Sequence, residues 1–220
     1  MKDLLILGTS AHAYEMIDII ERVNGQVNGF YSYKLIGLVA TDHQFEKRLG
    51  MTVYPLEALD GDMQDAALVP LHDIDIELKL KYRNRMITLI DPSCFVSRSA
   101  NIGCGCVLYP NCFVGHQAVI HDFVFCLSGC RINHDDAIGM ATTMASGVTI
   151  AGHVTVQREA YLGQGCTING GIEIGEKSLI GTGAVVTKGV RPDAVMVGNP
   201  ARILRFRLEQ KDDAMSSQEQ

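Results

Sequence analysis

Residues 162–186 read LGQGCT INGGIE IGEKSL IGTGAV V, so that an aliphatic residue stands at every sixth position. The same step runs without insertion from Ile90 to Val186, which makes 17 successive positions. Of these, 15 are Ile, Leu or Val, where the composition of the chain would give about four by chance. The 17 positions are Ile90, Val96, Ile102, Leu108, Val114, Ile120, Cys126, Ile132, Ile138, Met144, Ile150, Val156, Leu162, Ile168, Ile174, Ile180 and Val186.

The residue two places before each aliphatic position is mostly small, as at Cys112, Ala118 and Cys130. Residues two apart in a strand share a face, so each repeat directs one large and one small side chain inward. Glycine often follows the aliphatic residue and suits a tight turn. This pattern is typical of the sides of a triangular parallel β-helix, with three sides in each 18-residue coil. The repeat therefore predicts nearly six coils.

The first part of the chain has a different pattern. Residues 4–7 form an apolar strand, the stretch GTSAHA follows at 8–13, and a helical period begins at Tyr14. Residues 35–40 and 66–70 read as further strands, which predicts a small Rossmann-like α/β half-domain. Ligands of such sheets lie at the carboxyl ends of the strands, where free helix N–H groups bind phosphate. Candidate nucleotide-binding residues are Gly8, Ser10, His12 and Asp42, although an ordinary strand-to-helix turn would also fit.

Glycine distribution supports a division of the chain, because 16 of the 22 glycines lie beyond residue 100. We expect a Rossmann-like domain at 1–88, a β-helix at 89–190, a C-terminal loop or cap at 191–208 and a flexible tail at 209–220.

Composition excludes several partners. The net charge of −6 argues against nucleic acid or an anionic membrane as partner, since phosphate binding needs a basic face. The uncharged stretch 137–157 is long enough to span a bilayer, but its Gly, Thr and Ser content and six-residue period favour the β-helix. Seven cysteines without a CxxC pair or a signal peptide predict reduced thiols and a cytoplasmic location.

A Rossmann-like half followed by a hexapeptide-repeat β-helix resembles the bacterial nucleotide-sugar acetyltransferases. This group of left-handed β-helix acyltransferases includes UDP-4-amino-sugar N-acetyltransferases and sialic acid O-acetyltransferases. The resemblance covers residues 2–206 and rests on LGTSAHA at 7–13, INHD at 132–135 and VGNPAR at 197–202. It implies a homotrimer, acetyl-CoA as co-substrate between neighbouring β-helices, a nucleotide-linked sugar on the N-terminal domain, and no metal. His134 matches the general base of the group.

The 18-residue period places His134 in a column with His116 before it and Gly152, Gly170 and Lys188 after it. Coils stack at the strand spacing of ~4.8 Å, so His134 and Lys188 lie roughly 14 Å apart. The two glycines between them would leave a groove for the pantetheine arm of acetyl-CoA, with Lys188 near its phosphates. Gly181 belongs to a second glycine column, which could supply the facing wall from a neighbouring subunit. Alternatively, these glycines serve only tight turns.

Acetyl transfer by direct attack requires a base for the proton of the attacking group, and a histidine suits this at neutral pH. The resemblance favours Asp135 as the residue that orients His134. Asp136 is a rival, because it occupies an inward position where a carboxylate needs partners. The N–H of Gly152 could bind the thioester oxygen as negative charge develops. The reaction expected is N-acetylation of a nucleotide-linked amino sugar in bacterial surface glycan biosynthesis, with O-acetylation of a sialic-acid-type sugar as the alternative.

The chain departs from the group at three places. Thr143 stands where many members have a second histidine. Ala11 stands where the group usually has a glycine, and Leu71-His72 stands where a glycine is expected after the strand at 66–70. These departures leave the sugar specificity open.

Two other classes share this fold. His116 and His121 resemble part of the metal site of γ-class carbonic anhydrases, but the third ligand would fall at Leu80, outside the repeat. A non-catalytic trimeric scaffold is the third possibility, which the Asn-His-Asp motif and the glycine column argue against.

Overall fold

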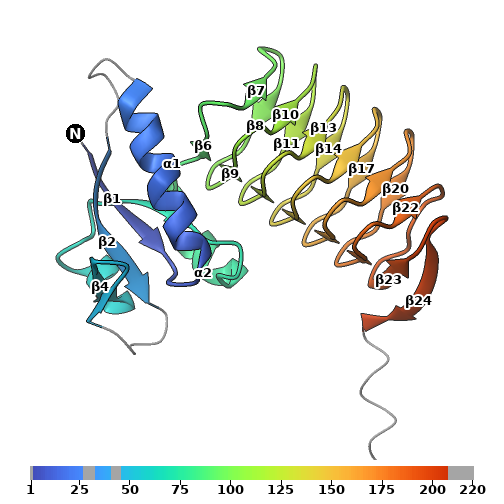
Figure 1. The fold of residues 1–220 in the computed structure, drawn as a ribbon. Coiled ribbons are helices and arrows are strands. Elements are labelled where there is room, and N and C mark those ends of the chain that lie inside the picture. Colours follow the sequence, from blue (N-terminus) through green and yellow to red (C-terminus); the bar gives the residue numbers. More distant parts are fainter. Residues whose placement is uncertain (1, 27–32, 41–45, 208–220) are drawn as a thin grey trace, which may run out of the picture.

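The computed structural model describes residues 2–26, 33–40 and 46–207. They form an N-terminal α/β unit followed by a three-sided β-helix, with two longer strands at its far end (Figure 1). Predicted residue Asp42 and the predicted tail at 209–220 lie outside the described residues.

The α/β unit is built on a sheet with strand order β3-β4-β2-β1-β5. Neighbouring strands are parallel except for the edge pair β3 and β4. The elements are β1 (Lys2–Leu7), α1 (His12–Gln26), β2 (Tyr33–Ala40), β3 (Lys47–Arg48), β4 (Met51–Pro55), the 3-10 helix η1 (Leu56–Asp60), β5 (Ala67–Pro70), α2 (Ile76–Lys81) and the 3-10 helix η2 (Arg83–Arg85).

Strand β1 lies inside this sheet rather than at its edge, and its residues Leu4–Leu7 are fully buried. Its neighbours are β2 on one side and β5 on the other, so the order of the strands reverses at β1. In open parallel sheets, ligands bind at the carboxyl ends of the strands where the order reverses. That point is occupied by Gly8 and by the residues that follow β5.

The β-helix has three parallel faces made of two-residue strands. Strands pair with the next coil at a distance of 18 residues, as Ile132 does with Ile150, so the predicted coil length is confirmed. The first face is β7 (Phe95–Val96), β10 (Phe113–Val114), β13 (Arg131–Ile132), β16 (Thr149–Ile150), β19 (Thr167–Ile168) and β22 (Val185–Val186). The second is β8 (Asn101–Ile102), β11 (Val119–Ile120), β14 (Ala137–Ile138), β17 (Thr155–Val156) and β20 (Glu173–Ile174). The third is β6 (Leu89–Ile90), β9 (Val107–Leu108), β12 (Phe125–Cys126), β15 (Thr143–Met144), β18 (Tyr161–Leu162) and β21 (Leu179–Ile180). It is extended by the longer strands β23 (Ala194–Val197) and β24 (Arg202–Phe206), which are antiparallel to each other.

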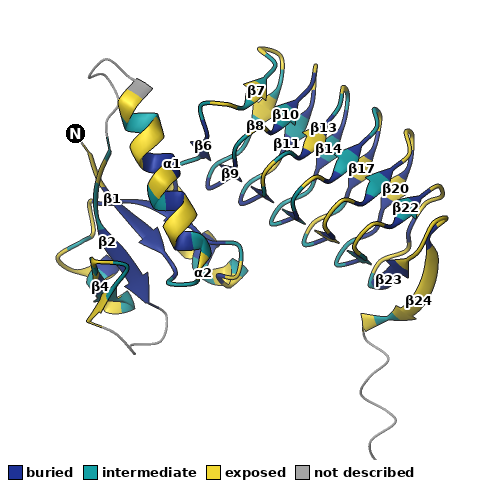
Figure 2. Ribbon diagram, in the orientation of Figure 1, coloured by how far each residue is buried: buried dark blue, intermediate teal, exposed yellow. Residues whose placement is uncertain are grey.

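The core of the β-helix follows the predicted alternation of large and small residues. Ile150 and Ile168 are fully buried, as are the small residues Cys130 and Cys166. Buried residues recur in every coil of the β-helix (Figure 2). All seven cysteines are free thiols. Burial raises the pKa of Cys166 to about 12, so this thiol is a packing residue rather than a nucleophile.

The α/β unit packs on the first coils of the third face. Outward side chains of Val107 and Phe125 belong to the same apolar cluster as β1 and β5. The Tyr109 hydroxyl donates a hydrogen bond to the His12 carbonyl oxygen at 3.2 Å. Arg22 lies 3.1 Å from the Asp91 carboxylate, whose side chain is fully buried. Apolar and ionic contacts therefore hold the two parts together.

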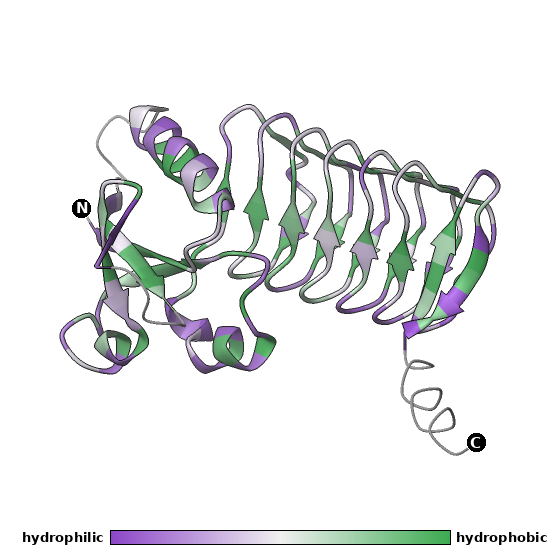
Figure 3. Ribbon diagram, turned by 60° about the horizontal axis from the view of Figure 1, so that its bottom comes forward, coloured by the Kyte–Doolittle hydropathy of each residue, from purple (hydrophilic) through white to green (hydrophobic). Residues whose placement is uncertain are grey.

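None of the helices within the described ranges has the length and apolar character needed to cross a bilayer. The uncharged stretch 137–157 instead contains β14 to β17. Hydrophobic residues lie along many of the β-helix strands (Figure 3).

Candidate active site

His134 lies at the turn between the first and second faces, which we call the His134 corner (residues 133–136). Its Nδ1 atom lies 2.8 Å from Oδ2 of Asp135. When Nδ1 carries the proton in this hydrogen bond, Nε2 keeps the lone pair and can accept a proton. The hydrogen bond from His134 holds the pKa of Asp135 below its usual range, with His153 and His116 adding to the effect. The pair has the geometry of an oriented general base.

Gly152 lies directly below the His134 ring in the next coil. A Cβ atom at this position would lie 2.6 Å from Cε1 and 2.7 Å from Nε2 of His134. In the following coil, a Cβ at Gly170 would lie 2.9 Å from the Gly152 carbonyl oxygen. Both positions therefore need glycine, and they form a strip without side chains that ends at the exposed Lys188. We call Gly152 and Gly170 the glycine strip.

Asp136 points into the β-helix and is 1% exposed. Its Oδ2 atom accepts a hydrogen bond from the Asn133 N–H and its Oδ1 atom one from the Val154 N–H, each at 2.8 Å. Both oxygens are thus engaged with the backbone, and Asp135 is the carboxylate that contacts His134. Burial raises the pKa of Asp136 to about 6.

A raised pKa links Asp136 to the pH dependence of stability. The folded-state pKa exceeds the unfolded value, so the contribution to the free energy of unfolding is complete below pH 4 and is lost as pH rises through 6. Between pH 4 and pH 6, we expect the free energy of unfolding of wild type, relative to that of Asp136→Asn, to fall by about 1.4 kcal/mol per pH unit. Urea unfolding from pH 4 to pH 7 measures the slope. Asp135→Asn is the control. The free energy of unfolding of wild type relative to that of Asp135→Asn should not fall over this pH range, because the pKa of Asp135 is lowered.

His153 is a site residue that the sequence analysis missed. It follows Asp135 by one coil, and its ring contacts the His134 ring edge to face with 5.0 Å between centroids. Its Nε2 atom lies 3.9 Å from Oδ2 of Asp135. Both Asp135 and His153 have left-handed backbone conformations, with φ of 60° and 62°. The 18-residue period could have found this residue, because it places His153 in the column of Asp135.

The carbonic-anhydrase-like arrangement is not assembled here. Leu80, at the position of the missing third ligand, is an exposed residue of α2. His116 Nδ1 lies 2.7 Å from the Ser99 hydroxyl. Thr143 begins β15 on the third face, away from the His134 corner.

Part of the predicted nucleotide site lies at the end of β1. Gly8 has a φ of 119°, and a Cβ there would lie 2.6 Å from Cδ1 of Leu71, so close packing explains this glycine. The Ser10 hydroxyl oxygen is buried without a hydrogen-bond partner among the described residues. His12 begins α1, and its Nδ1 lies 3.1 Å from the Glu15 carboxylate.

Aromatic side chains from both parts of the protein meet at this site. The His72 ring lies 5.0 Å from that of His12 and 5.1 Å from that of Phe125, between centroids. The Tyr109 ring packs at a tilt against that of Phe125, with 5.3 Å between centroids. His72 Nδ1 is buried without a partner among the described residues, and burial lowers the pKa of His72. The unpaired His72 nitrogen, which lies beside aromatic rings, suits a ligand that is both planar and polar.

Gly181, the predicted facing wall of the groove, lies beneath β23. A Cβ there would lie 2.9 Å from Cγ1 of Val197, so packing within this chain already requires a glycine.

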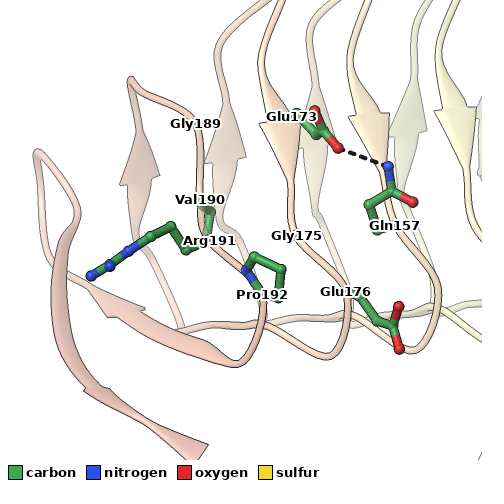
Figure 4. Close-up of a pocket in the computed structure, with 8 residues that line it drawn as sticks. All are labelled: Gln157, Glu173, Gly175, Glu176, Gly189, Val190, Arg191 and Pro192. Carbon is green, nitrogen blue, oxygen red and sulfur yellow. Dashed lines mark hydrogen bonds between the residues drawn. The ribbon is translucent and has the colours of Figure 1, made fainter.

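A pocket of about 450 Å³ lies on the second face near the end of the glycine strip (Figure 4). Gly189 and Arg191 line one side, and Glu173 accepts a hydrogen bond from the Gln157 amide at 2.8 Å. Glu176 also lines the pocket. Because the carboxylates of Glu173 and Glu176 would repel an anion, Lys188 is a better binding partner for a phosphate than this pocket.

The two candidate sites lie on different sides of one chain. The aromatic cluster abuts the third face through Phe125, whereas the His134 corner joins the first and second faces. In a three-sided helix that corner is opposite the third face. The two sites of a single chain therefore do not face each other.

Sequence comparison finds no matching protein-family model and no matching curated protein. Solved structures match almost the whole chain. The acetyltransferase domain of PglB from Neisseria gonorrhoeae superposes with a TM-score of 0.81 and 20% identity, covering 93% of this chain and 100% of that domain. This chain has the fold of that acetyltransferase domain. PerB from Caulobacter crescentus, solved with CoA and GDP-perosamine, gives 0.80 and 24%, covering 92% and 97%. WeeI from Acinetobacter baumannii gives 0.80 and 22%, covering 93% and 100%.

The β-helix predicted from the repeat is confirmed by these similarities and by the three parallel faces.

Proposed function

We propose that this protein transfers an acetyl group from acetyl-CoA to the amino group of a nucleotide-linked amino sugar. The observation that carries the proposal is the His134–Asp135 pair above the glycine strip. The fold shared with PerB, a GDP-perosamine N-acetyltransferase solved with CoA, supports it. We place the protein in the cytoplasm, in bacterial surface glycan biosynthesis.

In the proposed reaction, the sugar amine attacks the thioester carbonyl carbon while Nε2 of His134 accepts the amine proton. The tetrahedral intermediate then breaks its C–S bond, and His134 returns the proton to the departing CoA thiolate. The products are an amide and free CoA. Asp135 keeps Nδ1 protonated and stabilises the imidazolium. We assign the N–H of Gly152 to the oxyanion, because Gly152 is the residue directly below the His134 ring. The reaction requires neither a metal nor an acyl-enzyme.

Acetyl-CoA would lie along the glycine strip. The His134 ring lies over Gly152 and places the base at one end of the strip. The absence of a side chain at Gly170 leaves room for the pantetheine arm, and Lys188 at the other end would bind a phosphate.

Lys188→Gln should raise the KM for acetyl-CoA about tenfold and leave kcat nearly unchanged. A charge-assisted hydrogen bond to phosphate contributes about 1.5–3 kcal/mol, and solvent exposure of Lys188 favours the lower end. Steady-state kinetics over a range of acetyl-CoA concentrations measures the effect. Lys177→Gln, at a half-buried position on another corner, is the control, because it removes the same charge from the same β-helix. An unchanged KM in Lys188→Gln would remove this residue from the cofactor site.

The nucleotide sugar would bind at the end of β1. We assign Gly8, Ser10, His12 and Asp42 to it, and the aromatic cluster around Phe125 suits a base or sugar ring. Because the two sites of one chain lie on different sides, the proposal includes a homotrimer in which neighbouring subunits complete each active site. Analytical ultracentrifugation tests the assembly, and a monomer that retains full activity would contradict it.

A product assay with acetyl-CoA and a panel of UDP-, GDP- and dTDP-linked amino sugars, together with free sialic acid, tests the function. Amide formation with at least one amino sugar is expected. Acetylation of sialic acid alone would show an O-acetyltransferase. No acetylation of any acceptor would contradict the proposed function.

A further inference from the structure

The His134 corner brings together two imidazoles and one carboxylate. One ligand atom from each of His134, Asp135 and His153 can be chosen so that all three lie within 4.8 Å of one another. The same oxygen, Oδ2 of Asp135, lies 2.8 Å from Nδ1 of His134 and 3.9 Å from Nε2 of His153. Side-chain exposure is 56% for His134, 33% for Asp135 and 68% for His153, so solvent ions reach all three.

These distances are close to those of a metal centre. Zn²⁺ binds imidazole nitrogen and carboxylate oxygen at about 2.0–2.2 Å, so tetrahedral ligand atoms lie about 3.3 Å apart. Small side-chain rotations would bring both measured separations to that value. The backbone is already held in place: the His153 N–H donates to the His134 carbonyl oxygen at 3.1 Å, and the Asp135 N–H to that of His116 at 2.8 Å. The ladder between coils therefore fixes the three Cα positions.

We propose that His134, Asp135 and His153 form a Zn²⁺ site, and that occupation of this site switches the enzyme off. Two nitrogen donors with one carboxylate favour Zn²⁺ over Mg²⁺ or Ca²⁺, which prefer oxygen. Three protein ligands leave the fourth position to water. The binding half of the proposal stands on the geometry alone, and the inhibitory half rests on the proposed function.

Inhibition follows from the chemistry of imidazole. A neutral imidazole has one nitrogen with a free lone pair and one that carries a proton. If Zn²⁺ takes the lone pair of Nδ1, the proton resides on Nε2, which can no longer accept one. If Zn²⁺ binds Nε2, that lone pair is used directly. In either case His134 cannot act as the base while the metal is bound.

Equilibrium dialysis of the full-length protein against Zn²⁺ at pH 7.5 tests binding. We expect one Zn²⁺ per chain at this site in wild type, and at least about tenfold weaker binding in His153→Gln and in Asp135→Asn. His121→Gln is the matched control, because His121 is an exposed histidine of the same β-helix outside the cluster. Zinc bound by the cysteines is common to all four proteins and cancels in the comparison. Equal binding by wild type and His153→Gln would overturn the site.

A second measurement tests inhibition. Mass spectrometry follows the acetylated sugar rather than the released CoA, because zinc binds the CoA thiol. Each protein is compared with itself, with and without Zn²⁺. At saturating Zn²⁺, the rate of wild type should fall at least about tenfold, and a chelator should restore it. His153→Gln should need a higher zinc concentration for the same fall in rate. An undiminished rate in zinc-loaded wild type would overturn the inhibitory half. If no acceptor is acetylated even without zinc, the proposed function fails, and dialysis still decides the metal site.

Discussion

His134→Asn should lower kcat about 10²–10⁴-fold, with little change in the KM for acetyl-CoA. The magnitude is that of removing a general base from the transition state. The side-chain amide of asparagine cannot accept the proton of the attacking amine at neutral pH, whereas binding along the glycine strip does not use the imidazole. Steady-state kinetics with the best acceptor of the panel gives both constants.

His121→Asn is the matched control for this variant, since it removes an exposed histidine from the same β-helix and should leave kcat unchanged. Circular dichroism and thermal melting show whether each variant is folded. A folded His134→Asn protein with at least a tenth of the wild-type kcat would contradict the assignment of His134 as base.

Gly152→Ala should lower kcat about 10²-fold, although the substitution adds a single methyl group. That methyl carbon would lie 2.6 Å from Cε1 of His134 and 3.0 Å from its Nδ1, both well inside van der Waals contact. The ring must therefore turn away, which breaks its hydrogen bond with Asp135. A displacement of about 1 Å of a catalytic group costs about 10²-fold in rate.

A double-mutant cycle shows whether this effect passes through the His134 ring. In a His134→Ala background the added methyl meets no ring, so Gly152→Ala should change neither the residual rate at saturating acetyl-CoA nor the melting temperature appreciably. Equal losses from Gly152→Ala in both backgrounds would show that the methyl disturbs the coil itself, or the cofactor, rather than the base.

Much of the site was predictable because the β-helix is periodic. A fixed 18-residue coil converts sequence separation into spatial position, so the neighbours of His134 along the axis can be counted from the sequence. That reasoning placed Gly152 and Gly170, and the structure brings both next to one another beneath the ring. The same count also places His153 beside Asp135.

The choice between Asp135 and Asp136 needed the backbone. The two residues are adjacent, and the repeat alone does not say which reaches the histidine. Asp135 adopts the left-handed conformation with φ of 60°, which turns its side chain outward to His134. Asp136 then resumes the inward direction of the strand and is bound by two backbone N–H groups.

The sequence by itself determined the β-helix, its coil length and the placement of His134 at a corner, because each repeat needs information only from its neighbours in the same ladder. Tertiary structure decided how the α/β unit packs on the third face and which residues meet there. Phe125 occupies an outward position with no distinguishing pattern in the repeat, yet it lies against His72 and Tyr109. Such contacts join residues far apart in the chain and depend on how two separate apolar surfaces fit, which no local period encodes.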